Sequence, residues 1–428
     1  IMSSDMTGRN YWISVPSKQE AYYYLSFFVW PFGVMLASLK HWKRPISRNV
    51  FWLFCVFFGL AFIIAEGELS ADSEYYANAL TQYANSNLTL SELWRSFYSE
   101  NSNYVDIFQP VLTYLISRLT SNPTVLFTVF GFIFGYFYSS NIWYILNRIV
   151  GRITPIIFLY ILTFALLNPI WNINGFRMWT AAQIFLFGAL PYFFEGKRKS
   201  LIWSAAAILV HFSFLYPVAI LGLFSLLKNR LDGYFVFFVI TSFIKELDLD
   251  FVRNSLSFLP GFLQARVTGY TNLDYAEFRL ERVQLHNWYI AYSRLALQWV
   301  VYAFTIFVYF FFKKQLYARK ELLTLFCFSI LLYGCANIFS LVPSGGRVLV
   351  VATTFMFAFA IILISTYPQV KSLTVIKTIL FPFLLLYCIV KLREGMDFYG
   401  LSTIIGNPIF SVFYTDTVPL IEEIKGFL

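Results

Sequence analysis

The stretch Asn174-Gly175-Phe176-Arg177 is a short polar break between two long apolar runs. A second stretch, Ser344-Gly345-Gly346-Arg347, repeats the pattern of Asn or Ser, then Gly, then Arg, and also opens a long apolar run. Asn and Ser are favourable N-cap residues, so we expect a helix to begin at each stretch with Asn174 or Ser344 as its cap. Apolar runs of this kind, separated by short polar breaks, predict a bundle of transmembrane helices.

The two arginines, Arg177 and Arg347, lie in the first turn of their predicted helices. A cation is unfavourable there, because this end of the helix dipole is positive. The repeated placement indicates that an anionic group binds nearby, since free helix N–H groups and a guanidinium together make a phosphate site. The alternative is that both side chains mark the membrane surface and extend their charges into it.

The composition is that of a polytopic membrane protein. Of the 428 residues, 58% are hydrophobic and 21% aromatic, and only 13% are charged. We therefore expect one all-α integral membrane domain over residues 1–428, with about 10–12 transmembrane segments. The net charge of +9 does not indicate nucleic-acid binding, because much of the Lys and Arg lies in short loops that orient the spans. The four cysteines lie inside apolar runs without metal-ligand spacing or a disulfide pattern.

The short basic loops orient the chain, because such loops stay in the cytoplasm. They are Lys40–Arg44, Lys197–Lys199 and Lys313–Lys320. The polar segments 66–122 and 245–287 then lie on the outer side. Within the first of them, apolar residues from Phe108 to Leu119 recur at helical spacing, which predicts an amphipathic helix at the outer interface.

The apolar run Leu201–Leu227 is predicted to form a broken hairpin. A single span would place Lys228 and every later basic loop on the wrong side of the membrane. Two short segments, 201–212 and 214–226, bent near His211, keep those loops inside. Each half would be about 18–20 Å long and too short to cross a bilayer. We therefore expect the bend to be buried in protein or to line a water-filled cavity.

This topology places Arg177, His211 and Arg347 on the outer side together with the acidic stretch Glu66–Glu74. Such groups suit transfer chemistry on a phosphate-linked substrate: the arginines would hold a pyrophosphate leaving group, and His211 or a carboxylate such as Asp72 would take a proton from the attacking hydroxyl. Alternatively, His211 is a buried neutral histidine and Asp72 a solvated loop carboxylate. Further residues that either contact substrate or face solvent are Glu66, Glu68, Tyr75, Arg266, Arg279 and Arg282.

The order of these residues resembles a known family. Asp72–Tyr75 gives Asp-x-x-Tyr after the second span, Arg177 opens a middle span, Ala206–Ser213 gives Ala-x-x-x-x-His-x-Ser, and Gly345–Arg347 is a late Gly-Gly-Arg. Over roughly residues 50–365 the pattern is similar to the EpsG-like branch of the Wzy-type polysaccharide polymerases.

The resemblance implies a multi-pass glycosyltransferase of the bacterial inner membrane. Such enzymes join oligosaccharide repeat units carried on undecaprenyl pyrophosphate, moving the growing chain onto a new unit at the periplasmic face. By resemblance, Arg177 and Arg347 would bind pyrophosphate, and His211 and Asp72 would be near the chemistry. No cofactor, nucleotide sugar or catalytic metal is expected. The expected partners are membrane lipid, a flippase and a chain-length regulator, and nucleic acid is not expected to be a partner.

Other functions remain open from the residues alone. A lipid-phosphate-dependent glycosyltransferase that adds a single sugar could use the acidic stretch Glu66–Glu74. A flippase or transporter for the lipid-linked sugar would also need basic residues in a cavity, although it should reach substrate from both sides. A membrane acyltransferase is suggested by His211 only. The chain has no phosphate-loop and no His-Glu-x-x-His motif, which argues against ATP-driven transport and zinc hydrolysis.

Overall fold

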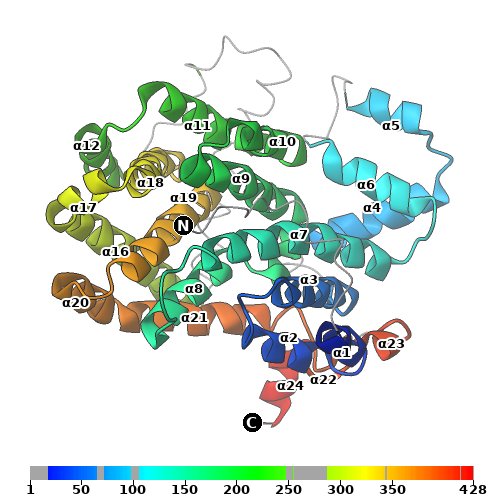
Figure 1. Cartoon of the computed structure of the whole chain (residues 1–428). Coiled ribbons are helices and arrows are strands. Elements are labelled where there is room, and N and C mark those ends of the chain that lie inside the picture. Colours follow the sequence, from blue (N-terminus) through cyan, green and yellow to red (C-terminus); the bar gives the residue numbers. More distant parts are fainter. Residues whose placement is uncertain are drawn as a thin grey trace.

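The computed structural model of the protein describes residues 18–64, 72–97, 106–246, 254, 287–342, 345–414 and 416–427. These residues form a layered bundle of helices (Figure 1). They contain no strand, and the one isolated bridge among them pairs Phe62 with Tyr399. The all-α class predicted from the sequence is therefore confirmed.

Five helical stretches among the described residues are long and apolar enough to cross a membrane. They are α7 (Pro123–Leu146), the stretch Pro155–Glu195, α16 (Trp288–Phe311), α18 (Lys320–Phe339) and α19 (Gly346–Thr366). A pair bent by 42°, α20 (Lys371–Ile379) and α21 (Phe381–Gly395), makes a sixth if it is one span. Shorter apolar helices such as α3 (Pro45–Leu60) and α12 (Leu231–Ser242) accompany them. The polytopic membrane architecture is confirmed.

The stretch Pro155–Glu195 reverses direction in its middle. It contains α8 (Pro155–Leu167), the 3₁₀ helix η2 (Ile170–Gly175) and α9 (Phe176–Glu195). Helix α8 ends at Leu167, with Asn168 as its C-cap, because the following Pro169 disfavours a helical conformation in Asn168. The Asn168 side chain donates to the Trp179 carbonyl at 2.9 Å, and Gln183 donates to the Asn168 carbonyl at 3.3 Å. Helix α9 therefore runs back past the end of α8.

Two helices near the start of the described chain, α3 and α7, pack at very short range. A Cβ added at Gly59 would lie 2.3 Å from the Phe127 carbonyl oxygen, and one added at Gly131 would lie 2.4 Å from that of Cys55. Glycine permits this approach, as small residues do at helix interfaces in membranes. This close pairing fixes α7, against which α9 also packs.

The predicted hairpin around His211 is confirmed. It consists of α10 (Leu201–Val210), the short 3₁₀ helix η4 (Phe212–Phe214) and α11 (Leu215–Leu227), with His211 extended between the helices. Two contacts show that α10 runs antiparallel to α9. Ser204 donates to the Phe185 carbonyl at 2.9 Å, and Ser213, further along the chain, contacts Met178, nearer the start of α9. Helix α11 then returns, so that Tyr192 near the end of α9 donates to Ser225 at 3.2 Å.

An arm of three helices lies on one side of the bundle (Figure 1). They are α4 (Ser73–Asn85), α5 (Leu90–Ser96) and α6 (Phe108–Ser117). A helix is thus found where the sequence predicts an amphipathic one. Its polar residues Gln109, Thr113 and Ser117 are buried, and its Leu115 is exposed. The predicted apolar stripe is divided, because Phe108 and Leu112 pack against the core while Leu115 faces outward.

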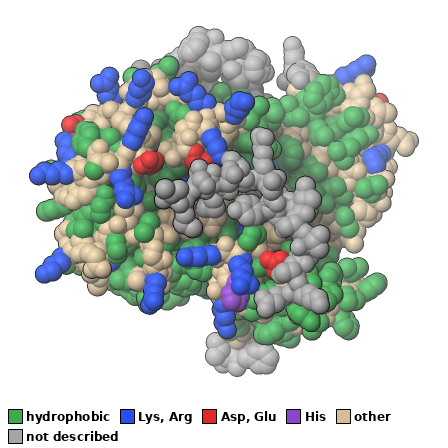
Figure 2. Space-filling view, in the orientation of Figure 1, with side chains coloured by type: hydrophobic (Ala, Val, Ile, Leu, Met, Phe, Trp, Pro, Cys, Tyr) green, Lys and Arg blue, Asp and Glu red, His purple; other side chains and the backbone are tan. Residues whose placement is uncertain are grey.

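The basic loops lie at the end of the bundle away from this arm. Figure 2 shows most Lys and Arg side chains over the left part of the molecule, where Figure 1 places α12 and α17 (Lys313–Ala318). There Lys313 pairs with Asp232 at 2.6 Å. The remaining helices are α1 (Lys18–Phe27), α2 (Pro31–Leu39), α22 (Ser402–Ile405), α23 (Pro408–Ser411) and α24 (Leu420–Phe427).

Candidate functional site

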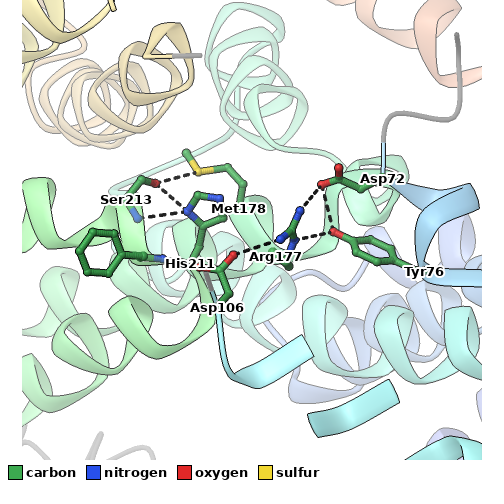
Figure 3. A network of polar contacts seen from close by, with 8 residues as sticks. Asp72, Tyr76, Asp106, Arg177, Met178, His211 and Ser213 are labelled. Atoms are coloured by element: carbon green, nitrogen blue, oxygen red, sulfur yellow. Dashed lines mark hydrogen bonds and ion pairs between the residues drawn. The ribbon is translucent and has the colours of Figure 1, made fainter. Parts of the chain in front are cut away.

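Arg177 is the centre of a closed polar cluster between the arm and the bundle (Figure 3). Its Nη2 lies 3.2 Å from Asp72 Oδ2 and its Nη1 lies 3.4 Å from Asp106 Oδ2. Its Nε donates to the Tyr76 hydroxyl at 3.2 Å, and that hydroxyl donates to Asp72 Oδ2 at 3.1 Å. We call these four residues the arginine cluster.

Helix starts position the members of the arginine cluster. Asp72 is the N-cap residue of α4, and Tyr76 follows one turn later on the same side. Asp106 lies two residues before α6, and Arg177 is the second residue of α9. Three helices that are remote in sequence thus begin around one guanidinium.

The predicted N-cap at Asn174 is wrong. Helix α9 begins directly after η2, so Asn174 lies inside the 3₁₀ helix and Gly175 becomes the N-cap, with no side-chain cap. At the second stretch Gly345 is the N-cap of α19, also without a side-chain cap, and Ser344 lies outside the described residues. Glycine at both positions leaves the helix start uncovered by a side chain.

Asp106 is the most buried charge of the arginine cluster. Its side chain is 1% exposed, compared with 33% for Asp72 and 25% for Arg177. A buried carboxylate without partners would be strongly destabilising. Here Oδ2 faces Arg177, and Oδ1 accepts a hydrogen bond from the Phe212 backbone N–H at 2.7 Å. Asp106 therefore connects Arg177 to the bend of the hairpin.

Tyr76 is fully buried beside these charges. Burial, reinforced by the neighbouring Asp72 carboxylate, raises the pKa of Tyr76 well above its usual value. The hydroxyl therefore keeps its proton, which it donates to Asp72 while its oxygen accepts from Arg177. This bond fixes the orientation of the Asp72 carboxylate.

His211 lies beside the arginine cluster, at the bend of the hairpin (Figure 3). Its Nδ1 accepts a hydrogen bond from the Ser213 backbone N–H at 3.2 Å and lies 2.7 Å from Ser213 Oγ. Among the described residues, the charges that act on the imidazole include those of Asp106, Arg177, Arg347 and Asp72. Arg347, the second residue of α19, is therefore within electrostatic range of His211.

The remaining candidate residues divide into three groups. Arg347 is partly exposed and makes no hydrogen bond or ion pair with any residue that the structure describes. Tyr75 is 51% exposed, and its neighbour Tyr76 is the tyrosine that reaches Arg177. The other candidates lie outside the described residues: Glu66, Glu68, Arg266, Arg279 and Arg282.

Sequence reasoning missed Asp106 and Tyr76. The available signal for Asp106 was its place at the head of the predicted helix that starts at Phe108, inside an external segment. An acidic residue there can face the positive end of the helix, or a cation on a neighbouring element.

Within the described ranges, no group of three or more His, Cys, Asp and Glu side chains is arranged to hold a metal ion.

The fold and the site define a polytopic membrane protein with a cluster of opposite charges at one end of its helix bundle. In a comparison with protein families, residues 49–402 match the EpsG family. The chain therefore belongs to the EpsG family, and this membership supports a membrane protein of the polysaccharide-polymerase type. Searches among curated proteins and among solved structures found no match.

Proposed function

We propose that the protein is a membrane glycosyltransferase that polymerises a polysaccharide from oligosaccharide units linked to undecaprenyl pyrophosphate. The observation that carries the proposal is the arginine cluster, in which two carboxylates hold Arg177 next to the bend at His211, while the charge of Arg347, a cation without a partner among the described residues, acts on the same imidazole. Family membership supports the polymerase class.

The reaction needs two capabilities from the protein. An acceptor hydroxyl oxygen forms a bond to the anomeric carbon of the donor glycan as the bond from that carbon to the pyrophosphate oxygen breaks. Cations stabilise the charge that develops on the leaving pyrophosphate. A basic group, Asp72 or His211, takes the proton of the hydroxyl. The site offers both kinds of group and requires no cofactor for either.

Arg347 is the principal pyrophosphate-binding residue in this proposal. Arg177 contributes as well, because only three of its five N–H groups have protein partners in the arginine cluster. The other two donate to no described residue and would bind phosphate oxygens. The Asp72 and Asp106 carboxylates hold the guanidinium in place while they reduce the net positive charge around it.

The proposal places the site at the outer face of the inner membrane. Helix α9 has 20 residues and is therefore about 30 Å long, the thickness of the hydrocarbon core. Arg177 is at its beginning, and the basic loop Lys197–Lys199 follows its end. Because short basic loops stay in the cytoplasm, the end that carries Arg177 is the outer one.

The test replaces Arg347 with Ala in cells that lack the native gene. Loss of one such electrostatic contact should lower the polymerisation rate by roughly 10²–10³-fold, leaving no long polymer. Arg152→Ala, at an exposed position after α7, is the matched control and should give polymer of normal length. Long polymer from the Arg347→Ala variant would refute the assignment of Arg347.

A second measurement separates the possible functions. Purified protein in lipid nanodiscs is given undecaprenyl-pyrophosphate-linked oligosaccharide, and the products are resolved by size. A ladder supports the polymerase. One added sugar indicates a single-addition glycosyltransferase, and transfer of unchanged lipid-linked sugar across vesicles without a new glycosidic bond indicates a flippase.

A further inference from the structure

We infer that His211 is a hydrogen-bond donor to the leaving pyrophosphate through Nε2–H, and that Asp72 is the group that takes the proton from the acceptor hydroxyl. The identity of the substrate rests on the proposed function. The protonation of the imidazole rests on the geometry around His211 and can be measured without any substrate.

The contacts of Nδ1 determine the tautomer of His211. The Ser213 backbone N–H can only donate a hydrogen bond, and it points at Nδ1 from 3.2 Å. The Ser213 hydroxyl lies 2.7 Å from the same nitrogen and directs its one proton there rather than to Met178 Sδ at 3.7 Å, because a thioether sulfur is the weaker acceptor. The Nδ1 lone pair is therefore an acceptor, and the neutral imidazole carries its proton on Nε2. In this arrangement the His211 side chain caps the 3₁₀ helix η4.

This tautomer excludes His211 as the proton acceptor in the described arrangement. Nε2 already holds a proton, and Nδ1 is occupied by Ser213. Base chemistry would require a proton on Nδ1, which would break the cap of η4. The Nε2–H group is instead a donor, and Arg347, which pairs with no described residue, acts electrostatically on the same imidazole. A hydrogen-bond donor and a guanidinium in one site suit the anionic oxygens of a pyrophosphate.

The two carboxylates differ in their freedom to take a proton. Asp106 is 1% exposed and both of its oxygens have partners, Arg177 and the Phe212 N–H. Asp72 is 33% exposed, and its Oδ2 carries the contacts to Arg177 and Tyr76. Asp72 Oδ1 accepts no hydrogen bond from a described residue. The proton of the acceptor hydroxyl therefore goes to Asp72, and the electron pair of the breaking bond leaves with the pyrophosphate.

The tautomer is read from ¹⁵N spectra of histidine-labelled full-length protein in nanodiscs. The chain has only three histidines, so a spectrum of the His211→Gln variant identifies the His211 signals by their loss. We expect an unprotonated Nδ1 and a protonated Nε2 near neutral pH. A proton on Nδ1, or a doubly protonated ring, would overturn the inference.

Activity measurements test the donor role separately. A Gln amide can donate a hydrogen bond and cannot act as a base, so His211→Gln should retain polymerisation within about tenfold of the native rate. His211→Phe should lose roughly 10²–10³-fold, as expected for a lost donor to a developing anion. Equal losses in the two variants would contradict the donor role.

The pH profile distinguishes the two candidate bases, Asp72 and His211. Among the described residues, the charged groups that act on His211 include Asp72, Asp106, Arg177 and Arg347. The pH dependence of activity should be the same in the native protein and in His211→Gln, because the imidazole is not the group that takes the proton. Loss of an acid limb of the native profile in His211→Gln would make His211 the base. If the native protein formed no polymer at all, the proposed function would fail, while the ¹⁵N result would still decide the tautomer.

Discussion

Replacing Asp106 with Asn tests whether the buried carboxylate positions Arg177. The substitution keeps the shape of the side chain and leaves an oxygen that can accept from the Phe212 N–H. It removes the negative charge that faces Arg177 Nη1 at 3.4 Å. Among the described residues, Arg177 then keeps Asp72 as its one anionic partner, and a neutral amide replaces the carboxylate that joined Arg177 to the hairpin.

The size of the effect follows from the distance and the burial. At 3.4 Å and an effective dielectric constant of about 20, the Coulomb attraction is at most about 5 kcal/mol. Arg177 is one-quarter exposed and retains Asp72, so solvent and the second carboxylate reduce the net loss. We expect the free energy of unfolding to fall by about 2–3 kcal/mol. Misplacement of Arg177 should also lower the polymerisation rate by roughly 10–30-fold.

The assay compares two Asp→Asn variants in nanodiscs, using the initial rate of polymer formation and the midpoint of thermal unfolding. Asp232→Asn is the matched control, because Asp232 also pairs with a cation, Lys313 at 2.6 Å, but is 60% exposed at the other end of the bundle. An exposed pair of this kind contributes about 0–1 kcal/mol. If Asp106→Asn matched Asp232→Asn in both measurements, the positioning role of Asp106 would be refuted.

Two further substitutions test the surroundings of the site. Tyr76→Phe removes a hydroxyl that donates to Asp72 and accepts from Arg177, and should lower the free energy of unfolding by about 1–3 kcal/mol. The control is Tyr317→Phe, at an exposed tyrosine of α17, whose thermal unfolding should match that of the native protein. A native unfolding midpoint for Tyr76→Phe would contradict the network. Gly188→Ala places a Cβ 2.4 Å from the Ser204 backbone nitrogen, whereas Gly222→Ala meets no atom within 4 Å. Gly188→Ala should lower the free energy of unfolding by about 1–3 kcal/mol through overpacking, and with it the midpoint of thermal unfolding. Equal midpoints for the two variants would show that α10 can move away from α9.

The hairpin at His211 was predictable because charge determines membrane topology. Treating Leu201–Leu227 as one span would have put the later basic loops on the wrong side, so Lys228 and Lys313–Lys320 required a bend. The same assignment of loops to the two sides of the membrane predicted that Arg177 and His211 lie at one end of the bundle. The structure places both there, with Asp72 beside them.

The partners of Arg177 were not predictable, because they depend on tertiary contacts between distant segments. Asp106 belongs to no motif, and only the packing of α6 brings it to Arg177. Choosing between Tyr75 and Tyr76 requires the rotation of α4, which two adjacent tyrosines leave undetermined. The failed cap at Asn174 has a local cause, since the sequence pattern does not distinguish a 3₁₀ turn from the first turn of α9.

The arginine cluster also has a consequence for biogenesis. Asp72 precedes Arg177 by 105 residues, and Asp106 precedes Phe212 by 106. At a synthesis rate of about 5–20 residues per second, both carboxylates are synthesised roughly 5–20 s before their partners. The arm that carries α4 and α6 is thus translated well before the two segments that pair with its carboxylates. A chain that stops before residue 177 would therefore leave both carboxylates without the cation that they share.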